Sequence, residues 1–142
     1  MAKHKVLLDT NICLDAMLIR EPFAQTAEQL LFAAETRQVQ ILVSAISFDT
    51  LFYFAKRSYN TQKAYKALQS LRKIVNVAVV NQKSIDLALQ SNWKDFEDAL
   101  QHYSATGNGC DAIITRNIAD FSKSTVPLFT AQEFLLKEDF TL

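Results

Sequence analysis

The stretch that decides the fold is Lys5-Val6-Leu7-Leu8-Asp9-Thr10-Asn11. Its short apolar run is typical of a parallel strand that is buried on both faces. Asp9 would then stand at the carboxyl end of that strand, the edge at which open α/β sheets form their ligand sites. Asp9 therefore becomes functionally important if other carboxylates reach the same edge from elsewhere in the chain.

The rest of the chain alternates between short apolar runs and segments with helical periodicity. This alternation predicts a three-layer α/β/α fold whose central, mainly parallel sheet has four to five strands. We expect one domain over residues 1–142. The further strands are expected at 40–43, 76–80, 110–115 and 126–129, and the helices at 12–18, 23–37, 45–58, 61–73, 81–90, 95–106 and 130–137.

Local signals refine this outline. Ser44, Asn81 and Asp95 are placed to cap the helices that follow them. The aromatic residues of 45–58 indicate deep burial of that helix, and 116–124 is expected to be a polar loop. Thr130-Ala131-Gln132-Glu133 fits a capping box at the start of the last helix.

Composition narrows the function classes. The formal net charge is +0, so no global field attracts this chain to nucleic acid or membranes. Only two glycines are present, which excludes glycine-rich loops for phosphates or dinucleotides. His4 and His102 lack the spacing of zinc ligands, and Cys13 and Cys110 are expected to be free thiols. With no apolar run long enough for a membrane span, we expect a soluble, cytoplasmic protein.

Four aspartates are expected at one edge of the sheet. Asp9 and Asp120 follow strands, whereas Asp49 and Asp98 begin helices, and helices that follow strands start at that edge. Clustered carboxylates repel one another unless a cation neutralises them. A hard divalent cation with oxygen ligands, Mg²⁺ or Mn²⁺, fits such a cluster and can activate water for attack on a phosphodiester.

Each of these acids also has a structural interpretation. Asp9 could form a helix cap or an Asx turn, and Asp49 could be a favourable charge at a helix N-terminus. Asp98 could reach back in a capping arrangement, and Asp120 could be a turn residue. Outside the cluster, Glu97 is expected to be solvated or to support the site, and Asp111 to lie at the opposite edge of the sheet.

The motifs resemble a known family. The sequence Leu8-Asp9-Thr10-Asn11 is similar to the opening motif of PIN-domain ribonucleases. The segments 95–100 (DFEDAL) and 110–121 (CDAIITRNIADF) resemble the two later motifs of a VapC-like bacterial subgroup. Their order and spacing cover nearly the whole chain.

This resemblance implies a Mg²⁺- or Mn²⁺-dependent endoribonuclease, often the toxin of a toxin–antitoxin pair and often a homodimer. By motif, Asp9, Asp49 and Asp98 take the three main acidic positions of the family. The family usually has Glu where this chain has Asp49, and often Asp where it has Asn117. Asp120 could therefore replace Asn117 as the fourth ligand, or three carboxylates could hold the ion.

Supporting roles and RNA contacts follow the same resemblance. Asn11 and Thr115 resemble polar supporting residues, and Arg116 would stand nearer the metal. Basic residues in the middle of the chain could contact phosphates, be ordinary solvated surface, or flank a homodimer interface: Lys56, Arg57, Lys63, Lys66, Arg72 and Lys73. The alternative function is a catalytically degenerate PIN module that binds RNA or a protein partner without cleavage.

Overall fold

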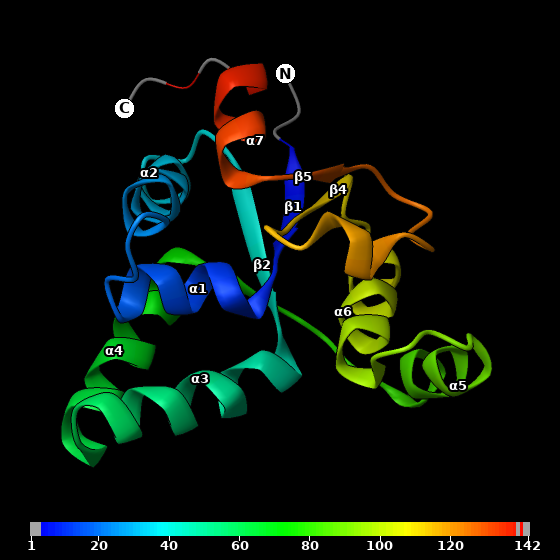
Figure 1. Ribbon diagram of the computed structural model, residues 1–142, viewed down its shortest axis with the longest axis horizontal. Helices are drawn as coiled ribbons and strands as arrows, with labels where there is room; N and C mark the ends of the chain where they lie inside the picture. The colour runs from blue at the N-terminus through cyan, green and yellow to red at the C-terminus, as the bar shows by residue number, and fades with distance from the viewer. Residues whose placement is uncertain (1–3, 139, 141–142) are drawn as a thin grey trace.

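Among the residues that the structure describes, the central sheet has five strands, all parallel, which lies within the predicted four to five. The structure, a computed structural model, describes residues 4–138 and 140. In this part of the chain the strand order is β3-β2-β1-β4-β5, and all pairs are parallel (Figure 1). The strands are β1 (Lys5–Leu8), β2 (Gln40–Ser44), β3 (Asn76–Ala78), β4 (Ala112–Ile114) and β5 (Leu128–Phe129).

The predicted helices are present with small shifts at their ends. They are α1 (Thr10–Met17), α2 (Ala24–Glu35), α3 (Ala45–Ser58), α4 (Thr61–Ile74), α5 (Gln82–Gln90), α6 (Phe96–Gly107) and α7 (Ala131–Glu138). The expectation of a polar loop over 116–124 was wrong in part, because a 3-10 turn, η1 (Ile118–Phe121), forms there. Its Phe121 is buried, which gives the turn an apolar anchor.

Two helical layers cover the sheet. Side chains of a strand alternate between faces, so Val6 and Leu8 join a core built with α1, α2, α3, α4 and α7. Leu7 and Ile113 point to the other face, where they pack with Ala105 of α6 and with η1. Figure 1 shows α5 lying outside α6 on this second side. The fold is therefore the predicted three-layer arrangement.

Most predicted caps are confirmed. Asn81 accepts a hydrogen bond from Ser84 N at 3.0 Å, and the Thr130–Glu133 capping box closes with bonds of 2.9 and 3.1 Å. Ser44 occupies the cap position of α3, but its side chain makes no capping bond. Its hydroxyl is buried without a hydrogen-bond partner among the described residues. The side-chain cap predicted at Ser44 was therefore wrong.

The expected deep burial of α3 was wrong in part: Leu51 and Ala55 are fully buried, but the aromatic residues are not. Phe48, Phe52 and Phe54 are only half-buried, and Tyr53 is 57% exposed. Helix α3 packs against α1, α4 and β2, and its last turns extend beyond the sheet (Figure 1). Phe48 and Phe54 pack against the border of the first core, whereas Phe52 covers the contact with α4 through its ring pair with Tyr65 at 4.8 Å.

The strand order creates a crevice between β1 and β4. The chain leaves β1 toward β2 on one side, while β4 pairs with β1 on the other. A parallel sheet binds ligands at such a reversal point, beyond the carboxyl ends of the strands. Leu8 is paired with Ile114, so Asp9 and Thr115 leave the sheet side by side. Asp111 lies at the opposite edge, where it accepts a hydrogen bond from Lys5 N at 3.0 Å, as predicted.

The expected free thiols agree with the structure. Cys13 and Cys110 are both free and buried. Burial raises the pKa of the Cys110 thiol to about 12, so it is not a ready nucleophile. Among the described helices, none has both the length and the apolar character needed to cross a membrane.

Candidate active site

Asp9 is held at the crevice by neutral donors. The side chain is buried, with only 3% of the residue exposed. Gln101 Nε2 donates to its Oδ1 at 3.0 Å, and Thr115 Oγ1 donates to its Oδ2 at 2.8 Å. Each carboxylate oxygen keeps a second lone pair for another ligand. The two bonds therefore fix the orientation of Asp9 without cancelling its charge.

Thr10 extends this network to α3. Thr10 N donates to Gln101 Oε1 at 3.3 Å, so one buried amide side chain contacts both Asp9 and Thr10. The Thr10 and Ser47 hydroxyls are 2.6 Å apart. The end of β1 is thereby tied to α6, α3 and the segment after β4, and its side chains are preorganised before any ligand binds.

Asp98 has the most perturbed carboxyl group of the site. Burial is the main cause, followed by the charges of Asp95, Asp9, Asp120 and Glu97, and together they raise its pKa to about 7. No cation offsets this effect in the described part of the chain. The charges of Asp9 and Asp120 thus contribute to the raised pKa of Asp98, and a cation beside these carboxylates would relieve their repulsion.

Glu97 also belongs to this cluster. Burial, Asp95 and Asp9 raise its pKa, and a hydrogen bond with the Thr10 side chain acts in the opposite direction. Of the two alternatives expected for Glu97, solvation or support of the site, the contacts agree with the second: its side chain is half-buried and interacts with the residue next to Asp9. Near its N-terminus α6 therefore brings two neighbouring acids toward Asp9.

Oxygen donors of this kind fit a hard divalent cation. Within the described ranges, no three His, Cys, Asp or Glu side chains are close enough to form a complete metal cage. Mg²⁺ does not need such a cage, since it usually keeps several waters and takes one or two carboxylates together with substrate phosphates. Asp9 and Asp98 would hold the ion, with Glu97 and Asp120 nearby.

Asp49 is not brought into the cluster. Its side chain is exposed, and its charge is not among the causes that raise the pKa of Asp98 or Glu97. Ser47, two residues earlier on α3, is the residue that faces Thr10. Positions two apart on a helix point in roughly opposite directions, so the role of Asp49 stays a prediction that this conformation does not support.

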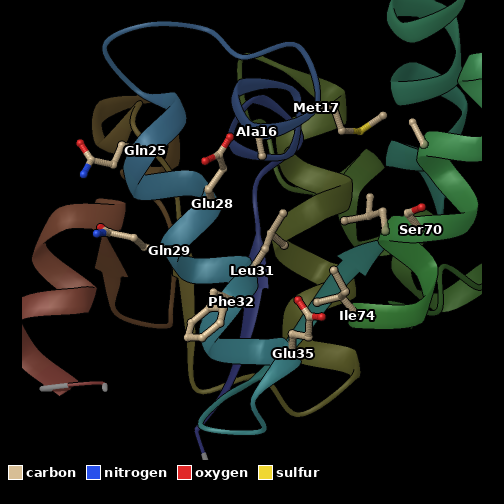
Figure 2. A pocket seen from close by; sticks show the side chains of 12 residues that line it. Ala16, Met17, Gln25, Glu28, Gln29, Leu31, Phe32, Glu35, Ser70 and Ile74 are labelled. Carbon is tan, nitrogen blue, oxygen red and sulfur yellow. The ribbon is translucent and has the colours of Figure 1, made fainter. Parts of the chain in front are cut away.

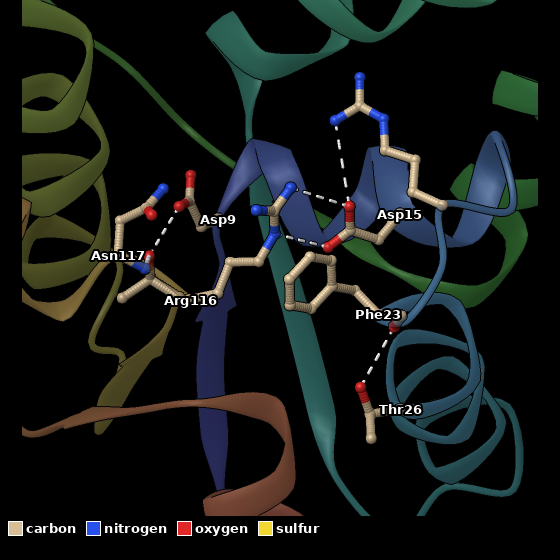
Figure 3. Close-up of polar contacts among 8 residues, drawn as sticks. Asp9, Asp15, Phe23, Thr26, Arg116 and Asn117 are labelled. Carbon is tan, nitrogen blue, oxygen red and sulfur yellow. Dashed lines mark hydrogen bonds and ion pairs between the residues drawn. The ribbon is translucent and has the colours of Figure 1, made fainter.

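Arg116 faces away from the acids. It forms a double hydrogen-bonded ion pair with buried Asp15, at 2.9 Å from Nε and 3.1 Å from the terminal nitrogen. Figure 3 shows its side chain directed to α1 rather than to Asp9. The guanidinium also lies over the Phe23 ring, 4.2 Å from its centroid. The expected position of Arg116 beside a metal was therefore wrong.

Asn117 and Asn11 flank the crevice. Asn117 N donates to Thr115 Oγ1 at 3.0 Å, so this residue is one hydrogen bond away from the donor to Asp9. Its side chain lies on the Asp9 side of the strand end (Figure 3). Asn11 is half-buried in the first turn of α1 and its side chain makes no hydrogen bond within the described residues.

Comparison with known proteins agrees with this architecture. A family model described as PIN domain matches residues 5–119, which is most of the chain. The chain belongs to the PIN-domain family.

Named relatives and solved structures cover nearly the whole PIN domain. This chain is 24% identical over 142 residues to "Ribonuclease VapC1" of Aquifex aeolicus, and the match covers 94% of this chain and 95% of the relative. A toxin-antitoxin complex from Klebsiella pneumoniae contains a chain with 27% identity and a TM-score of 0.65, covering 89% of this chain and 97% of that one. FitAcB from Neisseria gonorrhoeae shares the fold, with a TM-score of 0.69 at 17% identity and coverage of 89% and 98%.

Sequence reasoning missed one central residue of this PIN domain, Gln101. A signal for it existed, because Gln101 follows Glu97 by four residues and so shares its helix face. Glu97 approaches the buried aspartate from this helix face. A polar amide on the same face is therefore a candidate for orienting that aspartate. Asp15 was missed for a different reason, since its partner Arg116 lies about a hundred residues away in the sequence.

The basic residues predicted to contact RNA are all exposed: Lys56, Arg57, Lys63 and Lys66. They lie on the last turn of α3 and the first turns of α4. Figure 1 places this corner across the molecule from α6, which carries Asp98. Two of them contact tyrosines of the same corner, Arg57 with Tyr53 and Lys63 with Tyr59. Their role in RNA binding stays a prediction.

Proposed function

We propose that this PIN domain is a Mg²⁺- or Mn²⁺-dependent endoribonuclease that hydrolyses RNA phosphodiester bonds. The observation that carries the proposal is the uncompensated carboxylate cluster around Asp9 and Asp98, at the crevice between β1 and β4. The ribonuclease activity named for the Aquifex relative supports the same reaction class.

The roles of the side chains follow from their contacts. Gln101 and Thr115 hold Asp9 in one orientation, and Asp98 presents a second carboxylate from α6. Together these acids would bind the ion, whose chemistry is to activate water and to stabilise charge on the phosphate. Asp120 and Glu97 keep the local potential negative, which favours cation binding.

Substitution of the two ligands tests the proposal. Asp9→Asn and Asp98→Asn should each reduce RNA cleavage to background while circular dichroism and melting show a folded protein. Asp111→Asn is the matched control, because Asp111 lies at the opposite edge of the sheet, and it should cleave like the wild type. Full activity in both site variants, purified free of contaminating nuclease, would contradict the assignment.

The metal requirement needs its own measurement. Cleavage should stop in EDTA and return when Mg²⁺ or Mn²⁺ is added in excess. Undiminished cleavage in EDTA would exclude metal dependence. If no RNA is cleaved with either ion while RNA still binds, the alternative of a catalytically degenerate binding module is favoured.

We also propose that the protein is the toxin of a toxin–antitoxin pair. Its structural relative from Klebsiella is solved as a toxin-antitoxin complex. A suitable surface exists here: a cavity of about 760 Å³ between α2 and α4, lined by apolar side chains such as Leu31 and Ile74 (Figure 2). Phe32, at its edge, is 45% exposed. The lining also includes the exposed acids Glu28 and Glu35, which favour a basic, apolar antitoxin segment.

Co-expression tests this partner. The product of a small reading frame adjacent to that of this chain should co-purify with it and inhibit cleavage. Ala67→Glu, which places a charge in the cavity wall, should abolish capture, whereas Gln69→Glu on the exposed part of α4 should not. Equal capture by both variants would exclude this cavity as the docking site. The expected homodimer stays a prediction that sedimentation of the free protein can test.

A further inference from the structure

A second cavity opens directly beside the acids. Its volume is about 470 Å³, and it lies between the α5–α6 connection and the segment of η1. Asp98 and Asp120 line it, so the candidate metal site and this cavity share a wall. The remaining lining residues are Asn92, Trp93, Lys94, Asp95, Ala119, Ser122 and Lys123.

Trp93 lines the cavity, and its ring is packed against two other aromatic rings. Its ring lies 5.0 Å from that of His102 at an interplanar angle of 30°, and the Phe121 ring meets it edge-on at 5.7 Å. His102 and Phe121 are buried and do not line the cavity. His102 is itself fixed, because its Nε2 accepts a hydrogen bond from Thr125 N at 3.1 Å. The half-buried Trp93 ring is therefore positioned before any ligand enters.

Two lysines bring positive charge to the same cavity. Lys123 Nζ donates to the carbonyl oxygens of Asn92 at 2.9 Å and Ser91 at 3.5 Å, which joins the two walls. An ammonium has three donors, so one remains for a ligand. Lys94 is exposed. In the described part of the chain neither lysine forms an ion pair with the neighbouring aspartates.

We propose that this cavity binds one nucleotide of single-stranded RNA next to the scissile phosphate. Its base would lie against Trp93, and its phosphate would contact Lys123 and Lys94. Aromatic stacking combined with cationic phosphate contacts is how proteins hold unpaired nucleotides. The inference rests on the proposed ribonuclease function, and it places RNA at α6 and η1 instead of the Lys63–Lys66 corner.

The chain contains a single tryptophan, so its fluorescence reports on this cavity alone. The Asp9→Asn variant, with Mg²⁺ present, is titrated with a fluorescein-labelled octa-adenylate RNA. Anisotropy measures binding, and Trp93 emission measures base contact. Emission should fall in step with binding. An oligomer of the same length with abasic sugars should bind more weakly and leave Trp93 emission nearly unchanged.

Substitutions separate the two candidate RNA surfaces. In the same background, Lys123→Gln should weaken binding several-fold and lower the salt slope by about 0.7. Lys66→Gln is the matched control on α4 and should change neither quantity. Trp93→Leu should weaken binding about five-fold or more. Trp93→Phe, which keeps a ring for His102 and Phe121, should lose less and covers the case in which the leucine variant fails to fold.

The outcomes also separate this inference from the proposed function. RNA that binds without changing Trp93 emission, with affinity lost in Lys66→Gln rather than Lys123→Gln, would overturn the nucleotide site. If the wild type still cleaves RNA in that case, the ribonuclease proposal survives. Quenching of Trp93 by RNA that the wild type cannot cleave supports the nucleotide site and overturns the ribonuclease proposal instead.

Discussion

Asp98→Asn should make the metal-free protein more stable at pH 8 and leave its stability almost unchanged near pH 4. The pKa of Asp98 is raised to about 7 from an ordinary value of 3.8. The folded protein therefore binds this proton more tightly than the unfolded chain does. The free energy of unfolding falls as pH rises between these two values, and the full penalty is present above pH 7.

The size of the effect follows from the same shift. A tenfold change in proton affinity corresponds to about 1.4 kcal/mol, so the difference between 3.8 and about 7 sets a ceiling of about 4 kcal/mol. Asp98 is only half-buried, and water screens part of this repulsion. We therefore expect Asp98→Asn to stabilise the protein by about 1–2 kcal/mol at pH 8.

Urea unfolding in EDTA at several pH values measures the effect. Asp86→Asn is the control, because Asp86 is exposed on α5 and is not among the charges that raise the pKa of Asp98. Adding Mn²⁺ at pH 8 should stabilise the wild type more than Asp98→Asn, since only the wild type keeps both ligands. If Asp98→Asn is less stable than the wild type at pH 8 in EDTA, the carboxylate makes a stabilising contact and the repulsion argument is refuted.

Three further substitutions follow from the contacts of the site. Gln101→Leu should lower kcat about tenfold or more with a small change in KM, because Asp9 loses an orienting donor; unchanged steady-state kinetics would contradict this. Asp49→Ala should keep most of the cleavage rate in the same assay, since Asp49 is exposed. Complete loss of cleavage would show that Asp49 belongs to the active site. Arg116→Ala should destabilise the protein by about 3 kcal/mol in urea unfolding, because buried Asp15 loses its main partner. An unchanged unfolding midpoint would show that this ion pair contributes nothing to stability.

Regular features of the fold could be predicted because they depend on local patterns. The run Val6–Leu8 identifies a buried strand, and the alternation of strands and helices identifies the layers. The same logic places Asp9 and Thr115 at one edge, since both follow parallel strands. The hydrogen bond between their side chains is therefore a consequence of sheet topology.

Side-chain directions could not be predicted in the same way. Arg116 follows Thr115 and could have turned toward Asp9 or toward Asp15, which both lie within reach of that edge. The choice depends on the position of α1 and on the Phe23 ring beneath the guanidinium, and neither is visible in a local pattern. Asp49 presents the same problem, because the rotation of α3 about its axis decides whether it or Ser47 faces Thr10.

The direction of Arg116 also leaves the acidic cluster without its guanidinium as a counter-charge. A guanidinium beside Asp9 and Asp98 would neutralise them and compete with a divalent cation for the same oxygens. Asp15 prevents this by binding Arg116 through two hydrogen bonds from the buried side of α1. The groups that do contact Asp9, the Gln101 amide and the Thr115 hydroxyl, are neutral. The fold thus orients the Asp9 carboxylate with neutral donors and directs the Arg116 guanidinium toward Asp15. The carboxylate oxygens of the cluster are therefore left available to a metal ion.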